Sequence, residues 1–193
     1  MAERHDDPEI FWVDPRRRGI LPLDGFRISR SLARRLRRDD YSVTLNRDFA
    51  GVLDGCADRS ETWINAEIRE LYTTLHMMGE AHSLEVWMDG MLAGGVYGVS
   101  VGGCFCGESM FSYRRDASKI ALAWLVDQLR RTGFQLCDTQ FLTAHLASLG
   151  GQEITRDAYR QRLAAALQTS PRIDGLPLAA SGHEVVQRNT QTS

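Results

Sequence analysis

Long apolar runs are missing from this 193-residue sequence, and lysine is almost missing, because Lys119 is the only lysine beside 22 arginines. No segment approaches the roughly 20 apolar residues that a membrane-spanning helix needs. Residues 1–7 are mostly charged, which predicts that no signal peptide is present. The sequence therefore favours a cytoplasmic protein without membrane segments. Its hydrophobic fraction of 43% is sufficient for one compact core.

Cysteine is too sparse and too irregularly spaced for a metal centre. The four cysteines are Cys56, Cys104, Cys106 and Cys137. Cys104 and Cys106 are closer together than usual zinc ligands, and no second Cys or His pair completes a site. We therefore predict four reduced thiols that mostly fill the core, and no metal site.

Charge is unevenly distributed, although the net charge is only −2. Residues 14–47 contain ten arginines and four aspartates, a local net charge of +6 that leaves −8 for the rest of the chain. This asymmetry predicts a polyanionic partner for the basic segment. Within it, Arg30, Arg34 and Arg37 have the i, i+4, i+7 spacing of one helix face. A solvated helix face is the alternative interpretation.

The predicted elements alternate between helices and strands, which indicates a mixed α/β sheet flanked by helices. Helices are predicted at residues 29–38, 47–57, 65–78, 117–131, 143–149 and 157–168, with Ser29 or Ser31, Asn65 and Thr155 as N-caps. Strands or extended segments are predicted at 10–13, 19–21, 41–45, 83–88, 91–99, 104–111 and 134–140. Asp89 and Gly90 are typical of a two-residue hairpin turn.

The last 25 residues differ in composition from the rest. Residues 169–193 are polar, contain proline and glycine, and show little periodicity, so we predict an extended or disordered tail there. The chain then divides into a short segment at residues 1–17, a compact domain at residues 18–168, and the tail at residues 169–193.

Asp138 and Gln140 lie at i and i+2 of the predicted strand 134–140, so their side chains are expected on one face. A carboxylate and an amide on one rigid strand could handle and orient a proton in a cleft. Two solvated polar residues on an exposed strand face are the alternative. Glu108 adds a carboxylate within residues 105–112, a short segment that also contains glycine, serine, methionine and phenylalanine.

A series of sequence blocks occurs in an order typical of one enzyme family. The blocks are Trp63-Ile64, Leu75-His76, Ala81–Trp87, Gly94–Val99, Gly107–Ser112, Ala117–Lys119, Asp138–Gln140 and His145–Gly150. Together they resemble leucyl/phenylalanyl-tRNA–protein transferase, a bacterial family that adds Leu or Phe from a charged tRNA to proteins beginning with Arg or Lys. The resemblance runs from about Phe11 to Leu167. It implies an N-acetyltransferase-like (GNAT) core, aminoacyltransferase activity without a cofactor, and a product marked for degradation.

The resemblance assigns the chemistry to Asp138, Gln140 and Glu108. In the family, the aspartate and glutamine of the D-x-Q strand act as a relay on the acceptor amine. We therefore expect Asp138 to orient and polarise Gln140, whose amide oxygen accepts a hydrogen bond from the amine. Net proton removal is expected to pass through water or the leaving 3′ oxygen of the ribose. Glu108 is expected to bind the cationic acceptor terminus; a buried structural glutamate paired with an arginine is the alternative.

The resemblance also implies an apolar pocket for the donated amino acid, which selects Leu or Phe by fit, with Met as a further candidate. The matching positions are Val96, Phe105, Met110, Leu122, Leu125 and Leu129. Without the resemblance, these residues would be assigned to an ordinary core.

Contacts with the tRNA are implied as well. Trp63 is expected to stack on the terminal adenine, with Tyr72 as a second contact at the 3′ end. Packing at a helix start is the alternative for Trp63. The resemblance aligns Arg30, Arg34 and Arg37 with positions that contact the tRNA backbone, where phosphate contacts supply affinity rather than sequence recognition.

Three further residues in family blocks have plainer interpretations. Lys119 could neutralise a phosphate near the 3′ end or form an ion pair. His82 and His145 have no Ser, Asp or Cys partner at triad-like spacing, so we interpret both as structural hydrogen-bonding residues.

Family members usually carry a longer segment before the block at Phe11, so we interpret residues 1–17 as the remnant of a truncated N-terminal subdomain. We expect this to affect tRNA affinity more than the chemistry, and we expect a monomer. Two rival functions remain. An acyl-CoA-dependent N-acyltransferase would need a glycine-rich pyrophosphate loop before a helix, which the sequence lacks. A shortened, non-catalytic copy that binds tRNA or protein is the second rival.

Overall fold

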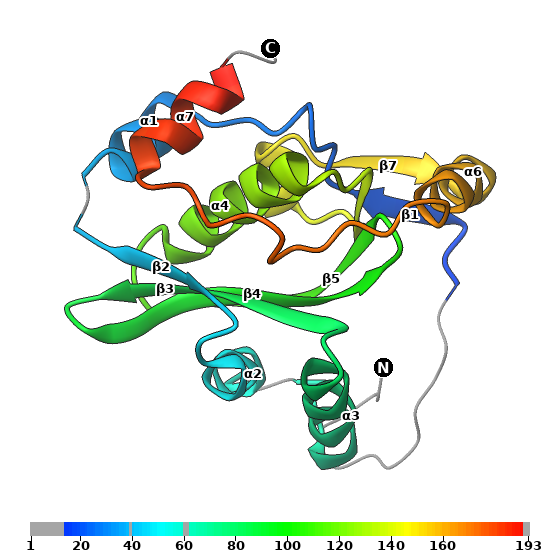
Figure 1. The fold of residues 1–193 in the computed structure, drawn as a ribbon, viewed down its shortest axis with the longest axis horizontal. Coiled ribbons are helices and arrows are strands. Elements are labelled where there is room, and N and C mark those ends of the chain that lie inside the picture. The colour runs from blue at the N-terminus through cyan, green and yellow to red at the C-terminus, as the bar shows by residue number, and fades with distance from the viewer. Residues whose placement is uncertain (1–13, 39, 60–61, 191–193) are drawn as a thin grey trace.

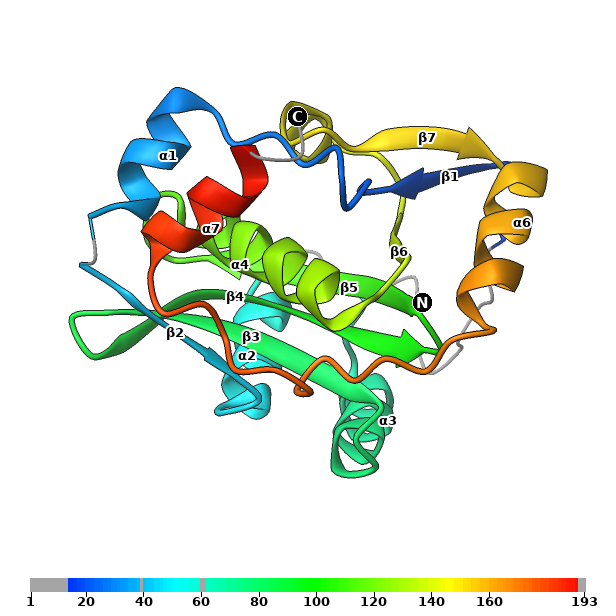
Figure 2. The ribbon, with the colours of Figure 1, turned by 45° about the horizontal axis from the view of Figure 1, so that its top comes forward.

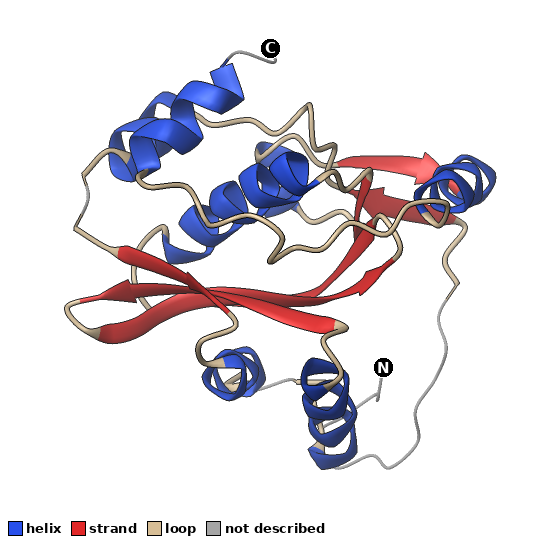
Figure 3. Cartoon of the chain, viewed as in Figure 1, coloured by secondary structure: helices blue, strands red, loops and turns tan. Residues whose placement is uncertain are grey.

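The centre of the protein is a seven-stranded mixed sheet (Figure 1, Figure 3). The computed structural model describes residues 14–38, 40–59 and 62–190. The sheet order is β2-β3-β4-β5-β6-β1-β7. Its strands are β1 (Arg17–Ile20), β2 (Ser42–Leu45), β3 (Ala81–Met88), β4 (Met91–Val101), β5 (Cys104–Ser112), β6 (Leu136–Gln140) and β7 (Gln152–Thr155). The mixed α/β class predicted from the sequence is confirmed.

Strands β5 and β6 run parallel, whereas the other neighbouring strands pair antiparallel. Helix α4 (Ala117–Thr132) connects this parallel pair. Pairing between the two strands ends where Cys106 lies opposite Asp138. Beyond that point β5 continues to Ser112 beside β4, so the two strands separate and leave room between them.

Helices cover both faces of the sheet (Figure 2). Helix α4 packs on one face, while α2 (Phe49–Ala57) and α3 (Ala66–Met77) pack on the other. Helix α1 (Arg30–Leu36) lies beside α7 (Gly182–Thr190), outside α4. Helix α6 (Arg156–Ala166) packs against β1, β6 and β7, and the short α5 (Ala144–Ser148) follows β6. No helix among the described residues is long and apolar enough to cross a membrane.

Local signals in the sequence place most of these boundaries. Ser29, Asn65 and Thr155 each accept a hydrogen bond from the first turn of their helix, as predicted. Asp89 and Gly90 join β3 to β4 with φ angles of 53° and 74°, which is the turn that the Asp-Gly pair predicts. Strand β7 was not predicted, because it has four residues and little alternation. The extended segment predicted at residues 10–13 lies outside the described residues.

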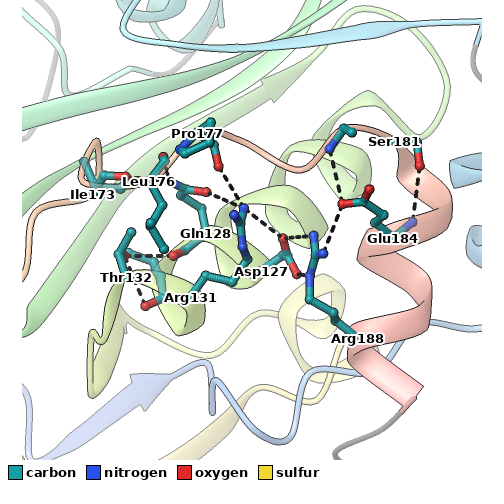
Figure 4. Close-up of polar contacts among 12 residues, drawn as sticks. Asp127, Gln128, Arg131, Thr132, Ile173, Leu176, Pro177, Ser181, Glu184 and Arg188 are labelled. Carbon is teal, nitrogen blue, oxygen red and sulfur yellow. Dashed lines mark hydrogen bonds and ion pairs between the residues drawn. The ribbon is translucent and has the colours of Figure 1, made fainter.

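The C-terminal segment is part of the compact fold, so the prediction of an extended or disordered tail is wrong for residues up to 190. Ile173, Val185 and Val186 are buried against the α4 side of the core. Buried Gln128 of α4 donates to the carbonyls of Ile173 and Leu176, both at 2.7 Å (Figure 4). These contacts are long-range, so local composition did not indicate them.

Ion pairs fix the helix at the end of this segment. Arg188 of α7 donates to both oxygens of Asp127, at 2.7 and 2.8 Å, and the Asp127 side chain is 6% exposed (Figure 4). Arg188 also contacts Glu184, one turn earlier in α7. The side chain of Asn189 donates to the carbonyl of Phe26 at 3.0 Å. Helix α7 therefore joins α4 to the segment that leads into α1.

Candidate active site

A cavity of about 260 Å³ opens where β5 and β6 separate. Its lining contains both polar groups and apolar side chains. Its lining residues are Arg59, Trp63, Val96, Gly107, Glu108, Ser109, Met110, Leu122, Thr139, Gln140, Phe141, Thr143 and Leu146. A partly apolar cavity with few convergent polar groups is typical of a ligand site.

Glu108 reaches this cavity because it is the extra residue of a β-bulge. Gly98 pairs with Gly107 and Tyr97 pairs with Ser109, so Glu108 has no opposite partner on β4. A bulge redirects the side chain that it contains. The Glu108 carboxylate accepts a hydrogen bond from the Gln140 side-chain amide at 2.9 Å and another from the Tyr72 hydroxyl.

Burial raises the pKa of Glu108 above its ordinary value, and the nearby charge of Asp138 acts in the same direction. The hydrogen bonds from Tyr72 and Gln140 and the charge of Arg18 oppose this rise. Glu108 forms no ion pair with an arginine among the described residues, so the alternative of a structurally paired glutamate is not supported. A partly desolvated carboxylate at a cavity can bind a cation that enters.

Gln140 stands at the end of β6 in a left-handed backbone conformation, with φ at 61°. Its backbone N–H donates to Asp138 Oδ1 at 2.8 Å, which is the geometry of an Asx-turn. The side-chain NH₂ faces Glu108, and since an ionised carboxylate only accepts hydrogen bonds, the amide oxygen points elsewhere. Gln140 lines the cavity and is available to a substrate there.

Asp138 does not share the cavity with Gln140, so the prediction of one common face is wrong. Its side chain is 0% exposed, and both carboxylate oxygens accept hydrogen bonds. The left-handed conformation of Gln140 breaks the strand alternation that places i and i+2 together. Asp138 contacts Gln140 through the backbone, not through the side-chain amide that it was expected to polarise.

Two residues that the sequence analysis missed hold Asp138 in place. Arg18 of β1 donates from Nε to Oδ1 at 2.9 Å and from Nη2 to Oδ2 at 2.6 Å. The hydroxyl of Tyr159 in α6 donates to Oδ2 at 2.8 Å. The Arg18 guanidinium also lies 5.0 Å from the centre of the Tyr159 ring. Arg18 is 120 residues from Asp138 in sequence, so no local pattern pointed to this contact.

The predicted apolar pocket residues fall into two groups. Val96, Met110 and Leu122 line the cavity. Phe105, Leu125 and Leu129 do not line it; they are almost fully buried in the core cluster between α4 and the sheet. Their spacing on β5 and α4 predicted correctly that they are buried. It could not distinguish residues that line the cavity from residues that fill the core behind it.

Trp63 lines the cavity just before α3, and Tyr72 packs against it edge to face, with ring centroids 6.3 Å apart. Tyr72 also reaches the site through its hydrogen bond to Glu108. Arg59, which was not predicted, lines the same cavity and donates to the carbonyl of Met110. The two aromatic residues predicted for the tRNA 3′ end thus lie at the cavity.

A second, basic cleft of about 450 Å³ lies between α1 and the loop that joins β5 to α4. It is lined by Ser31, Arg34, Arg35, Arg38, Asp40, Met88, Arg114, Arg115 and Asp116. Arg35 pairs with Asp40, and Arg115 lies 3.7 Å from Asp116. Within the described part of the chain, Arg34, Arg38 and Arg114 have no carboxylate partner.

The other predicted basic contacts lie outside this cleft. Arg30 begins α1 and Arg37 is its C-cap; both are exposed, but they do not line this cleft. Lys119 pairs with Asp116 at 3.2 Å, which fits the ion-pair interpretation. His82 contacts the Asn46 side-chain amide at 3.0 Å, as a structural histidine would. Nε2 of His145 is buried without a hydrogen-bond partner in the described structure, so His145 differs from that expectation.

Comparison with known proteins identifies the family. The family model described as leucyl/phenylalanyl-tRNA protein transferase matches residues 20–164. The chain belongs to this family. A relative from Ruegeria sp. (strain TM1040), named leucyl/phenylalanyl-tRNA–protein transferase, is 70% identical over the whole chain and is covered over 91% of its own length. Relatives of the same name from Ruegeria pomeroyi and Cereibacter sphaeroides (strain ATCC 17029) are 64% and 60% identical over the whole chain, and are covered over 91% and 90% of their lengths.

The fold also resembles a solved structure outside this transferase family. The C-terminal DUF2156 domain of a protein from Agrobacterium fabrum matches with a TM-score of 0.50 at 11% identity. The match covers 77% of this chain and 62% of that domain. At this low identity the likeness concerns the fold alone, a mixed sheet flanked by helices as the sequence predicted.

The part matched by the transferase family model contains most of the site. Glu108, Asp138, Gln140 and Tyr159 lie within residues 20–164. Arg18, which holds Asp138, lies just before the matched region, and α7 lies after it. Contacts from outside the matched region therefore support residues inside it.

Proposed function

We propose that this member of the leucyl/phenylalanyl-tRNA–protein transferase family transfers Leu or Phe, with Met as a third donor, from aminoacyl-tRNA to the α-amino group of proteins that begin with Arg or Lys. The product is a peptide bond and a protein tagged for degradation. The enzyme acts in the cytoplasm as a monomer. The observation that carries the proposal is the Glu108–Gln140 pair in a cavity whose lining also contains apolar side chains.

The apolar lining residues suit the side chain of the donated amino acid. Val96, Met110 and Leu122 offer no hydrogen-bond partner, so they favour an apolar side chain that is not branched at Cβ, through fit. Each methylene is worth about 1–3 kcal/mol in such a pocket. Trp63 lies at the same cavity and can stack on the terminal adenine, an interaction worth about 1–3 kcal/mol per base.

The polar lining residues suit the acceptor. Glu108, when ionised, attracts the cationic N-terminal residue, because it has no arginine or lysine partner among the described residues. The free oxygen of the Gln140 amide accepts a hydrogen bond from the α-amino group of the acceptor. This hydrogen bond aims the α-amino nitrogen at the ester carbonyl. Holding amine and ester together in a reactive geometry can remove as much as about 7–11 kcal/mol of the barrier.

The bond changes balance without a further reactant. The neutral amine nitrogen attacks the ester carbonyl, the new C–N bond forms, and the C–O bond to the 3′ ribose oxygen breaks. The amine gives up one proton, which the ribose oxygen takes up as it leaves, either directly or through water. Gln140 orients the amine, but its neutral side-chain amide is too weak a base to keep the proton that the amine loses.

The basic cleft beside α1 suits the tRNA backbone. Arg34, Arg38 and Arg114 face a common space and have no carboxylate partner in the described structure. Arg30, Arg37 and Lys119 can extend this surface. Phosphate contacts of this kind give affinity that depends on salt but not on sequence.

A transfer assay tests the proposal. Phe- or Leu-charged tRNA is mixed with the protein and a peptide that begins with Arg, and the extended peptide is measured by mass. We expect transfer to this peptide and none to the same peptide acetylated at its N-terminus. The Glu108→Gln variant is expected to lose preference for Arg over Ala at the first position. If the parent protein transferred to neither the Arg peptide nor the Ala peptide with a free N-terminus, this result would contradict the proposal.

A further inference from the structure

The Asp138 carboxylate is fully engaged by donors from its own protein. Arg18 Nε and Nη2, the Tyr159 hydroxyl and the Gln140 backbone N–H all donate to it at 2.6–2.9 Å. Two oxygens offer about four lone-pair directions. Because the side chain is 0% exposed and does not line the cavity, it has no position from which to receive a proton from a substrate.

The two side chains that engage Asp138 come from segments far apart in the sequence. Arg18 belongs to β1 and Tyr159 to α6, and the guanidinium lies over the phenol ring. Both are largely buried: the Arg18 side chain is 17% exposed and Tyr159 is 9% exposed. A charge-assisted, bidentate pair with a stacked ring is a rigid arrangement.

This rigidity reaches the cavity through the backbone. Asp138 Oδ1 holds the Gln140 N–H and so maintains the left-handed conformation of Gln140. From that conformation the Gln140 side chain reaches Glu108. If the carboxylate turned away, the left-handed residue would lose its hydrogen bond and relax, and the amide would leave its place beside Glu108.

We propose that Arg18 and Tyr159 are positioning residues for aminoacyl transfer, which hold Asp138 as a fixed acceptor for the Gln140 backbone, and that the Asp138 charge takes no part in proton transfer. This inference rests on the proposed function of Glu108 and Gln140. It differs from a relay, in which the charge of Asp138 would act on the side chain of Gln140.

A pair of compensating variants separates the two roles. Arg18→Met leaves a buried carboxylate without its cation, and Asp138→Asn leaves a buried cation without its carboxylate. The double variant, Arg18→Met with Asp138→Asn, removes both charges. The Asn oxygen can still accept from the Gln140 N–H, and the Asn NH₂ can donate to the Tyr159 oxygen. Arg17→Met, on the neighbouring and exposed position of β1, is the matched control.

The measurement is kcat for Phe transfer, together with the stoichiometry of binding of a non-reactive, amide-linked phenylalanyl adenosine. The stoichiometry counts folded sites, so a loss of folded protein is not mistaken for a loss of rate. We expect each single variant to lose roughly 100-fold in kcat, the cost of about 1 Å of misplacement, while the control keeps its rate. The double variant is expected to recover to within about tenfold of the parent.

A double variant as slow as Asp138→Asn, with full binding stoichiometry, would overturn the proposal, because the charge itself would then be required. Should Arg18→Met not fold, Tyr159→Phe replaces it, with an expected loss of about tenfold in kcat that reflects one missing hydrogen bond. Absence of transfer by the parent protein would instead count against the proposed function. In that case, hydrogen exchange at the backbone N–H of Gln140 still tests whether Asp138 holds this group. Exchange should be slow in the parent and the double variant, and fast in Asp138→Ala.

Discussion

Gln140 carries a local strain that the surrounding residues maintain. Non-glycine residues seldom adopt a positive φ, and such a conformation costs of the order of 1–3 kcal/mol. Hydrogen bonds to Asp138 on one side and Glu108 on the other offset this cost. The strained residue also lines the cavity, so the strain lies where position matters most.

Glu108→Gln is expected to stabilise the protein at high pH while it impairs transfer. Burial raises the pKa of Glu108, so the folded protein keeps its proton at a pH where the unfolded chain has lost it. The free energy of unfolding therefore falls as the pH rises from the ordinary pKa of about 4.3 through the raised value. Thermal unfolding at pH 4 and pH 8 measures this: the Tm of the variant relative to the parent should be higher at pH 8 than at pH 4. An equal difference at both pH values would contradict it.

Gly19→Ala is expected to destabilise the site, because β1 approaches the turn after Gln140 too closely for a side chain. A Cβ at Gly19 would lie 2.4 Å from the carbonyl carbon of Phe141. Backbone atoms cannot yield as a flexible side chain does, so we expect a loss of at least about 1–3 kcal/mol in urea denaturation. Gly107→Ala is the control, since its Cβ would meet only the Asp138 carbonyl at 3.4 Å. Equal losses for both variants would refute the role of this contact.

At the scale of single residues, sequence patterns identified groups but not their partners. Glu108, Asp138 and Gln140 were predicted because they stand in recognisable blocks. The bulge that turns Glu108 into the cavity and the left-handed turn at Gln140 depend on how β5 pairs with β4 and on where β6 ends. Arg18 and Tyr159 were missed because contacts between distant segments leave no periodic signal.

At the scale of elements, α7 stabilises α4 through the ion pair between Arg188 and Asp127. Arg188→Ala would leave buried Asp127 with only Arg131, 3.9 Å away, as an ion-pair partner among the described residues. We expect a loss of about 1–3 kcal/mol, less than for a fully buried pair because Arg188 is partly exposed. Urea denaturation measures it, with Arg172→Ala, an exposed pair partner of Asp174 in the same segment, as the control. If the loss in the free energy of unfolding were no larger than that of the control, α7 would not stabilise α4 through this ion pair.

The elements that the sequence predicted well are those with local causes. Caps such as Asn65 and the Asp89-Gly90 turn form from contacts within four residues, so their side chains identify them. Strand β7 and helix α7 instead depend on surfaces supplied by β1 and α4. Their sequences have little pattern of their own, which is why a strand was missed and a helix was assigned to a tail.

At the scale of the whole molecule, the uneven charge becomes a basic cleft on one side. The excess of arginine in residues 14–47 is concentrated in part on α1, and Arg114 adds to it from the opposite wall. We expect tRNA binding to weaken steeply with salt. The double variant Arg34→Ala and Arg38→Ala should reduce the slope of log K against log salt by roughly 0.7–0.9 for each phosphate that is no longer neutralised.

Filter binding of tRNA at several salt concentrations measures this slope. Arg160→Ala and Arg162→Ala on α6, at the opposite end of the molecule from α1 in Figure 1, remove the same charge and serve as the control. The control should lower the slope little. Equal slopes for both double variants would assign the salt dependence to net charge rather than to the cleft.

The position of β1 in the sequence determines when, during synthesis, the active site can be completed. Strand β1 is made well before β6 and β7, the strands with which it pairs, which end at Gln140 and Thr155. A nascent chain must therefore keep β1 unpaired until synthesis has passed Gln140. Such non-local closure is slow and leaves strand edges exposed to chaperones and proteases. Since Arg18 lies on that strand, no shorter nascent fragment contains the anchored Asp138, and catalytic competence arrives late in folding.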